Sequence, residues 1–539
     1  MNSFVSGLVL LTGLVLGQDA KPAREPDASD DFFKKGAIPQ LRITVSESEL
    51  EKLKANDRSY VRCTIVENRK TTYKDVGIKL KGAAGSYREW DDRPALTLNS
   101  NKFVKGQTFH GLDKFHLNNS VQDETYTHEW VCEELFREAG VPATRVAHAR
   151  VWVNDRDLGL YVVKEGFDRT FLQRHFENAD GNLYDGGFVQ DIDAELEKDA
   201  GKGPDDRSDL IALLEACREP DLDERWRRID ETLDVEAFIT FMAMELMTCH
   251  WDGYTQNKNN FRIYFDPADN KARFLPHGMD QMFGDPNASI LDYPGAIVSS
   301  TVMQNPEWRA RYRERINELL PLFDPPSKLH KRVDALRRRL QPTLTAIDPQ
   351  LARDHLERVK EFKDRITARA ANLKEQSVQE DPQPPKPPEF DENGNMHLPD
   401  WYPAMESEDA VVEVVDLEGE KKGLSILCGP SGTCVASWRR RIALEKGTYV
   451  FHANVKTQDV AAIEDEKGSA AGLRISGANR TNTLNGTNDW TEVEYEFTIE
   501  EDIREVELVA ELRTTAGQAW FDPDSLHLSR KPPVEEPEK

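Results

Sequence analysis

The chain contains little cysteine and no excess of positive charge. Its 539 residues include six cysteines, and Lys plus Arg number 70 against 96 for Asp plus Glu. The resulting net charge of −26 repels nucleic acid and anionic membranes, so we expect neither as a partner. The chain is too long for one ordinary domain, and its hydrophobic fraction of 38% can support packed cores.

Long hydrophobic runs are also missing, apart from one at the N-terminus. Residues 4–16 form an apolar run that is too short to span a bilayer, which needs about 20 residues. The residues that follow it suit signal cleavage, so we predict that residues 1–20 are an export signal. No Lys or Arg precedes the run, which leaves an uncleaved N-terminal anchor as the alternative. Either route predicts a secreted or cell-envelope protein, and no later segment is expected to span a membrane.

The cysteines fall into two groups. Four of them lie scattered in apolar surroundings and are expected to be buried thiols: Cys63, Cys132, Cys217 and Cys249. Cys428 and Cys434 instead enclose a short loop rich in Gly, Pro and Ser, and in an exported protein this spacing favours a disulfide. A zinc site is not expected there, because no second pair of Cys or His lies nearby.

The first part of the chain has an α+β pattern. Residues 21–39 are polar and predict a flexible leader. Within residues 40–377, periodicity predicts strands at 41–45, 61–66, 76–81 and 95–98, helices at 46–54 and 125–139, and a hairpin over 146–163. From residue 208 onward helices dominate, including a buried apolar helix at 234–249, a hairpin over 260–275 and charged helices at 306–320 and 328–376.

The remainder of the chain has a different pattern. Residues 379–388 carry five prolines, and residues 378–400 as a whole predict a semi-rigid linker. Residues 401–530 alternate apolar and polar positions and predict a separate β-sandwich, with strands at 411–415, 435–444, 447–455, 472–475, 491–499 and 505–512. The Pro- and Glu-rich tail, 531–539, is expected to be disordered.

The segment His250-Trp251-Asp252 is the strongest chemical signal in the chain. Asn257 follows Asp252 by five residues, the spacing by which a kinase loop returns an amide to metal. Asp280 follows a short strand and precedes Phe283-Gly284, as a metal-binding Asp would. Asn260 is a second amide candidate for the metal. The alternative is that Asp, Gly and Asn here only build a turn. His277 beside Asp280 is expected to be structural rather than a ligand.

Upstream residues supply candidates for nucleotide binding. The turn containing Gly82, Gly85 and Ser86 follows a strand and could bring backbone N–H groups to phosphates. The nearby cations are Lys79, Lys81 and Arg93, and one of them should offset the phosphate charge. Glu165 ends a strand, where it could mark a hinge near adenine or pair with that cation. A surface Glu at a strand end is the alternative.

Together these segments resemble the CotH kinase family. The resemblance covers about residues 41–320 and rests on Lys81-Gly82-Ala83-Ala84-Gly85-Ser86, Phe115-His116-Leu117-Asn118-Asn119, Val153-Asn154-Asp155-Arg156-Asp157-Leu158-Gly159-Leu160-Tyr161, Asp252, Asn259-Asn260-Phe261-Arg262-Ile263-Tyr264 and Pro276-His277-Gly278-Met279-Asp280. It implies a two-lobed atypical protein-kinase-like fold that uses ATP and Mg²⁺ (or Mn²⁺) to phosphorylate Ser or Thr of exported proteins. It also implies that Asp252 is catalytic and that Asp280, with Asn260 or Asn257, binds metal.

The chain departs from the family pattern at two points. The family often has Trp-Asp-Leu-Asp where this chain has His277-Gly278-Met279-Asp280, and Arg93 stands where a Lys is expected. A catalytically inactive surface or assembly protein that binds nucleotide, protein or glycan therefore stays an alternative. A metal-dependent hydrolase built on Asp252 and Asp280 is a third. The C-terminal region resembles galactose-binding-like modules, in which Trp438, Trp490 and Trp520 could stack on sugars, although at least two are expected in the core.

Overall fold

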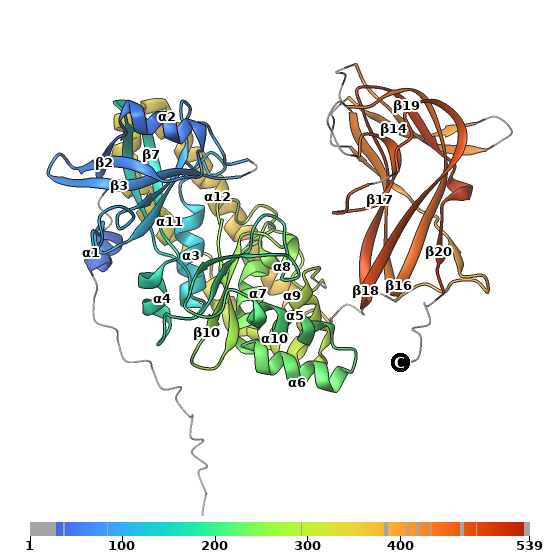
Figure 1. The fold of residues 1–539 in the computed structure, drawn as a ribbon, viewed down its shortest axis with the longest axis horizontal. Helices are drawn as coiled ribbons and strands as arrows, with labels where there is room; N and C mark the ends of the chain where they lie inside the picture. Colours follow the sequence, from blue (N-terminus) through green and yellow to red (C-terminus); the bar gives the residue numbers. More distant parts are fainter. Residues whose placement is uncertain are drawn as a thin grey trace, which may run out of the picture.

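The computed structural model has an N-terminal part of strands and helices and a C-terminal part of strands (Figure 1). It describes residues 28–35, 38–83, 85–292, 294–381, 386–405, 407, 409–417, 421–430, 432, 434–463, 468–480 and 482–532. The predicted export signal at 1–20, leader residues 21–27, linker residues 382–385 and the tail from 533 onward lie outside the described residues. In the described part of the chain, no helix combines the length and hydrophobicity needed to cross a membrane.

Seven strands close into a barrel in the order β1-β2-β3-β4-β5-β7-β6. They are β1 (Gln40–Thr44), β2 (Val61–Glu67), β3 (Thr71–Lys81), β4 (Ala95–Asn99), β5 (Lys114–Asn118), β6 (Val146–Val153) and β7 (Arg156–Glu165). Parallel pairing of β1 with β6 closes the barrel. Along β2, Val61, Cys63 and Ile65 are buried and alternate with more exposed residues, because successive side chains point to opposite faces of a strand.

Two short helices accompany the barrel. The helix α2 (Glu47–Ala55) begins at Ser46, whose side chain accepts a hydrogen bond from the Glu49 N–H, as the sequence predicts. The helix α1 (Ala28–Lys35) lies in the predicted flexible leader, so that prediction is wrong for these residues. Phe32 of α1 packs against the rings of Phe109 and His110, and this aromatic contact anchors the helix.

A second hydrophobic core contains most of the remaining helices and a small sheet. The helices are α3 (His128–Glu138), α4 (Arg169–His175), α5 (Ser208–Arg218), α6 (Leu222–Thr232), α7 (Val235–Met247), α8 (Tyr254–Asn257), α9 (Ile297–Gln304), α10 (Pro306–Leu319), η1 (Leu320–Leu322), α11 (Ser327–Ile347) and α12 (Pro349–Gln376). The sheet has the order β11-β10-β8-β9, with β8 (Leu183–Asp185), β9 (Glu197–Ala200), β10 (Phe261–Asp266) and β11 (Lys271–Pro276). The single helix predicted at 328–376 is two helices, because Asp348 has an extended backbone and caps α12.

The C-terminal region is all-β around its own hydrophobic core. Its elements are β12 (Asn395–His397), β13 (Tyr402–Met405), β14 (Val411–Asp416), β15 (Lys422–Leu427), β16 (Cys434–Ala461), β17 (Ala470–Ile475), β18 (Gly486–Thr514), β19 (Ala516–Phe521), η2 (Pro523–Ser525) and β20 (His527–Arg530). The predicted strands at 435–444 and 447–455 are one strand, β16, and those at 491–499 and 505–512 are one strand, β18. These two strands pair along most of their length, with irregularities where turns were predicted. β12 lies in the predicted linker but pairs with β20.

Two side-chain predictions in this region need correction. Cys428 and Cys434 are free thiols, so the predicted disulfide is absent from the described structure. Of the three candidate tryptophans, Trp438 is buried in the core, whereas Trp490 is exposed and Trp520 is half-buried. The expectation that at least two of them are core residues is therefore wrong.

Candidate active site

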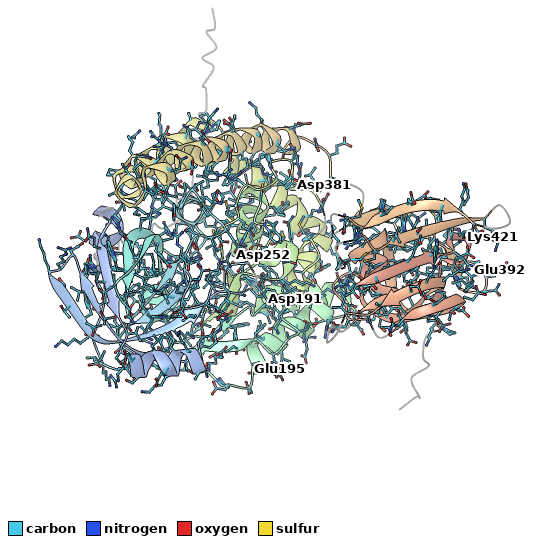
Figure 2. The ribbon with its side chains drawn as sticks, turned by 90° about the horizontal axis from the view of Figure 1, so that it is seen from above. Asp191, Glu195, Asp252, Asp381, Glu392 and Lys421 are labelled. Carbon is cyan, nitrogen blue, oxygen red and sulfur yellow. The ribbon has the colours of Figure 1, made fainter. Side chains whose placement is uncertain are left out.

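A cavity of about 410 Å³ lies between residues of the barrel part and residues of the helical part. The predicted site residues that line it are Lys81, Gly82, Ser86, Asp252, Asn257, Asn260 and Asp280. In Figure 2, Asp252 lies between the blue-to-cyan barrel and the green helices. Folding thus brings together residues that are separated by up to two hundred positions in the sequence.

The loop that carries Asp252 is held by Glu245, a buried residue of α7. The Glu245 carboxylate accepts hydrogen bonds from the backbone N–H groups of Tyr254 (3.1 Å) and Thr255 (2.8 Å) at the start of α8. A Cβ at Gly253 would clash with this carboxylate, so a glycine is required there. The segment that directly follows Asp252 is therefore tied to the helix α7.

Three asparagine amides converge on the Asp252 carboxylate. The Nδ2 atoms of Asn257, Asn259 and Asn260 lie 2.6, 3.1 and 2.7 Å from its oxygens. Hydrogen bonds to an ionised carboxylate stabilise the charged form and fix its orientation. Asn257 and Asn260, the two candidates for the metal-binding amide, thus both contact Asp252. Asn259 makes a third contact that spacing alone did not identify.

Asp280 lies just after β11 and faces the same cavity. Burial raises the pKa of the Asp280 carboxyl to about 7, and the negative charge of Glu129 acts in the same direction. The ring Nδ1 of His128 lies 2.7 Å from the Asp280 carbonyl oxygen, and His277 N–H donates to the Asn260 carbonyl at 2.9 Å. These bonds connect the Asp280 segment both to α3 and to the loop that follows Asp252. His277 is half-buried, contacts the Phe167 ring and also lines the cavity, so its structural role stays a prediction.

Lys81 is the cation that the structure brings to the cavity. Its ammonium donates to Oδ1 of Asn118 at 2.6 Å, and Asn118 in turn donates to Glu129 at 2.7 Å. Burial lowers the pKa of Lys81 to about 8, while the Glu129 charge acts in the opposite direction. Among the described residues that line the cavity, Lys81 is the only Lys or Arg. Four carboxylate side chains line the same cavity.

A buried ion-pair cluster shares Glu129 with the hydrogen-bond chain that begins at Lys81. Lys164 lies 3.1 Å from Glu129 and 2.5 Å from Glu133, and all three side chains are buried. Burial alone would lower the pKa of Lys164, but the charges of Glu133 and Glu129 raise it. Sequence reasoning missed this cluster. The available signal was the helix predicted at 125–139, which carries Glu129 and Glu133 among apolar residues on its buried face.

Two predicted cations lie outside the cavity. Lys79 projects from the strand that also carries Lys81, but its ammonium lies 5.0 Å from the ring centre of Tyr60. The Arg93 guanidinium donates to the carbonyl of Leu160 at 2.6 Å and packs against aromatic rings within the barrel part. Of the three candidate cations, Lys81 therefore lines the cavity, whereas Lys79 and Arg93 do not.

Two further predicted residues also do not line the cavity. Gly85 has a φ of +84°, and a Cβ there would come within 2.5 Å of the Gln122 amide, which does line the cavity. Glu165 is fully buried and makes ion pairs with Arg145 (2.9 Å) and Arg174 (2.6 Å). Its role in this geometry is to hold the end of β7, rather than to contact a nucleotide.

The donors in the cavity fit a hard divalent cation. Asp252 and Asp280 offer carboxylate oxygens, and each asparagine that directs its NH₂ at Asp252 keeps an amide oxygen for other partners. Oxygen ligands of this kind suit Mg²⁺ or Mn²⁺. The buried Asp280 carboxyl, with its raised pKa, would also be favoured in its ionised form by a nearby cation.

The family model for CotH kinase protein matches residues 78–374, more than half of the chain. The chain belongs to this family. The match confirms the resemblance, and with it a CotH kinase domain of helices and sheets that is accompanied by a C-terminal all-β region.

Curated relatives carry names from the same family. Invasin CotH7 of Rhizopus delemar is 23% identical over 316 residues, covering 53% of this chain and 52% of the relative. Spore coat protein homolog 1 of the same organism is 25% identical over 234 residues, covering 38% of this chain and 37% of the relative. Inner spore coat protein H of Bacillus subtilis is 21% identical, covering 47% of this chain and 74% of the relative. The chain thus spans about half or less of the length of the first two relatives.

Solved structures resemble the two parts of the chain only distantly. The Helicobacter pylori proinflammatory kinase CtkA has a TM-score of 0.24 and 11% identity, covering 56% of this chain and 98% of its own. TmCBM61 in complex with β-1,4-galactotriose has a TM-score of 0.17 and 15% identity, covering 24% of this chain and 88% of its own. Scores this low carry no argument about ligand or mechanism.

Proposed function

We propose that this CotH-family protein transfers the γ-phosphoryl group of ATP to a Ser or Thr hydroxyl of an exported protein. The observation that carries the proposal is the Asp252 carboxylate, which three asparagine amides orient within a cavity that also contains Lys81 and Asp280. Phosphoryl transfer depends mainly on such positioning and on charge stabilisation, with little covalent chemistry by the protein.

Each residue of the cavity has a distinct task in this proposal. Asp252 orients the acceptor hydroxyl and accepts its proton while the hydroxyl oxygen bonds to phosphorus and the bond from phosphorus to ADP breaks. Lys81 and the backbone at Gly82 and Ser86 bind phosphate oxygens. Asp280, with an amide oxygen of Asn260 or Asn257, would hold Mg²⁺ or Mn²⁺, which neutralises phosphate charge when bound.

The names of the relatives support an exported substrate. One relative is named as an inner spore coat protein, and the predicted export signal at 1–20 would likewise bring this chain out of the cytoplasm. A glycan-binding role of the C-terminal region is a second proposal, supported by the exposure of Trp490, whose ring is available for stacking.

Labelling with γ-phosphate-labelled ATP tests the proposed transfer. Wild-type protein with Mg²⁺ or Mn²⁺ should label itself or a surface protein, and Asp252→Asn should reduce labelling at least 100-fold while retaining nucleotide binding. The matched control is Asp205→Asn, because Asp205 is a highly exposed aspartate outside the cavity. Equal labelling by Asp252→Asn would refute the mechanism. Nucleotide binding without transfer would favour an inactive assembly protein, and release of product from a substrate without ATP would favour a hydrolase.

A further inference from the structure

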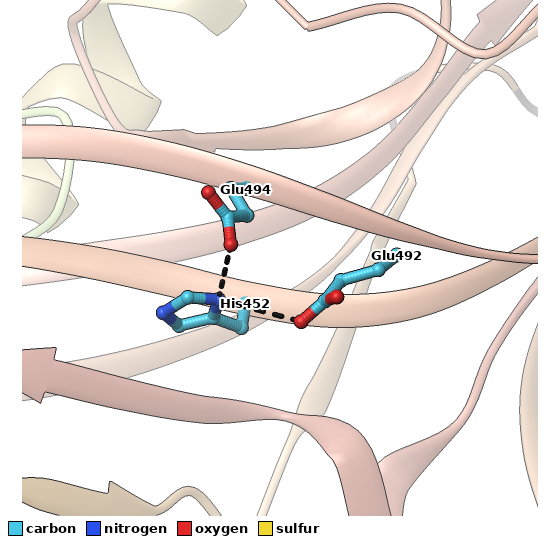
Figure 3. A group of neighbouring side chains, drawn as sticks. All are labelled: His452, Glu492 and Glu494. Atoms are coloured by element: carbon cyan, nitrogen blue, oxygen red, sulfur yellow. Dashed lines mark ion pairs between the residues drawn. The ribbon is translucent and has the colours of Figure 1, made fainter.

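A second group of possible metal ligands lies far along the chain from the cavity, on the C-terminal all-β region. His452 on β16 pairs directly with Glu494 on β18, and Glu492 lies two residues before Glu494 on the same face. The nitrogen and carboxylate oxygens of these three side chains all lie within 4.8 Å of one another. Figure 3 shows both carboxylates directed at the same side of the His452 ring.

The His452 ring is held in a fixed orientation. Its Nε2 lies 2.8 Å from Oγ of Ser529, and the His527 ring stacks on it with centroids 4.4 Å apart and an interplanar angle of 3°. The opposite nitrogen, Nδ1, is buried and makes no hydrogen bond of normal geometry to any described residue. It lies 3.2 Å from Oε1 of Glu494 and 3.8 Å from Oε1 of Glu492. In the tautomer with the proton on Nε2, the ring directs its Nδ1 lone pair at two carboxylates, an arrangement that a cation would stabilise, whereas with the proton on Nδ1 the ring donates to Glu494.

We infer that His452, Glu492 and Glu494 form a binding site for a zinc-class divalent cation. Ligands of a tetrahedral Zn²⁺ lie about 3.3 Å apart, given bonds of about 2.0–2.1 Å, so small rotations of the two exposed glutamates complete the geometry. One imidazole nitrogen favours Zn²⁺ over Mg²⁺ or Ca²⁺, which prefer oxygen alone. The two carboxylates also balance the charge of the ion, and Ser529 acts as the outer partner that fixes the ring.

Protonation of His452 is the competing explanation for this arrangement. An imidazolium could form ion pairs with both glutamates without any metal. Titration with a metal ion separates the two explanations, because an imidazolium paired with the glutamates predicts no bound ion in the wild type.

Titration of the full chain with Zn²⁺, followed by calorimetry, tests the site. Wild type should bind one ion that the double variant Glu492→Gln/Glu494→Gln does not bind, and each single variant should lose at least tenfold in affinity. Both glutamates are exposed, so these variants should fold normally, as thermal unfolding would verify. The matched control is Glu496→Gln, because Glu496 lies on the same face of β18 but pairs with Lys531; its affinity should stay within twofold of wild type.

Two further measurements distinguish this site from the cavity that contains Asp252 and Asp280. Co²⁺ in place of Zn²⁺ should give visible absorption that the double variant lacks, because a four-coordinate site perturbs the metal electronically. The Asp280→Asn variant should keep both the Zn²⁺ stoichiometry and the Co²⁺ spectrum of this site. Unchanged Zn²⁺ binding by the double variant, or loss of the ion in Asp280→Asn alone, would overturn the inference.

Discussion

The side-chain amide of Asn260 lies 2.7 Å from Oδ2 of Asp252, eight residues earlier in the chain. The same amide nitrogen also donates to the Asp252 carbonyl at 3.0 Å, and the Asn260 carbonyl accepts from the His277 N–H at 2.9 Å. Asn260 therefore connects the Asp252 loop with the segment that leads to Asp280. A displacement of either segment should be transmitted to the other.

Asn259 and Asn260 should differ in their effects when replaced by alanine. Asn259→Ala removes its contacts to Asp252 and a hydrogen bond from the Val189 N–H, so we expect kcat to fall about tenfold with the metal requirement unchanged. Asn260→Ala removes a candidate metal ligand as well, and should raise the metal concentration for half-maximal activity at least tenfold. Steady-state kinetics over a range of Mn²⁺ concentrations would distinguish the two. Equal metal requirements in both variants would exclude Asn260 as a ligand and favour Asn257.

Gly278→Ala should disrupt the site through steric conflict. Gly278 has a φ of +57°, which L-residues rarely adopt, and a Cβ there would clash with the Asn260 side chain. We expect loss of metal-dependent nucleotide binding and a lower melting temperature. The matched control is Gly284→Ala, where the nearest atom to a Cβ is 3.9 Å away and φ is not in the left-handed range. Normal nucleotide binding by Gly278→Ala would show that the Asn260 contact is dispensable.

Nucleotide affinity should weaken as pH rises above 8. The pKa of Lys81 in the free protein is about 8, lowered by burial from 10.5. ATP binds preferentially to the protein in which Lys81 is protonated. Above this pKa, ATP binding is therefore coupled to uptake of a proton by Lys81, and Kd should increase by up to tenfold per pH unit. Lys81→Arg keeps the charge at all these pH values and should remove most of the dependence. Affinities measured by calorimetry between pH 7 and 9.5 would check this, with Lys79→Arg as a control that retains the wild-type profile.

Lys164→Met should destabilise the fold strongly. The substitution leaves Glu129 and Glu133 buried without their common cation, and breaking a buried pair in this way costs about 3–5 kcal/mol. Urea unfolding would measure the loss. Lys34→Met is the matched control, since Lys34 is exposed and its pair with Asp30 is worth about 0–1 kcal/mol. A loss below about 1 kcal/mol in Lys164→Met would mean that the two glutamates take up protons at little cost.

Short-range patterns in the sequence predicted the centre of the site. One short segment of the chain contains Asp252, Asn257 and Asn260. Their spacing in the sequence therefore already restricts how far apart their side chains can be. Asp280 was predictable because it directly follows a hairpin that returns the chain to the same place. The alternating strands of the barrel and the apolar helix α7 were predictable for a similar reason, since each carries its own periodicity.

Long-range contacts were not predictable in the same way. Lys79 and Lys81 are equivalent by strand alternation, and only the folded structure shows that Lys81 lines the cavity whereas Lys79 lies over the Tyr60 ring. Glu165 was expected near a nucleotide or its cation, with an exposed strand end as the alternative, but the residue is buried and pairs with Arg145 and Arg174. The long strands β16 and β18 were divided in prediction at residues 445–446 and 500–504, whereas pairing with each other extends both strands through these positions.

The sequence by itself determined the family, the identity of Asp252 and Asp280 as paired candidates, and the change from an α+β part to an all-β part. Local spacing and periodicity encode each of these. Only the tertiary structure decided which of the candidate cations lines the cavity, which carboxylates lie near it, and that His452 meets Glu492 and Glu494 across neighbouring strands. These contacts depend on register and packing between distant segments, which no local pattern records.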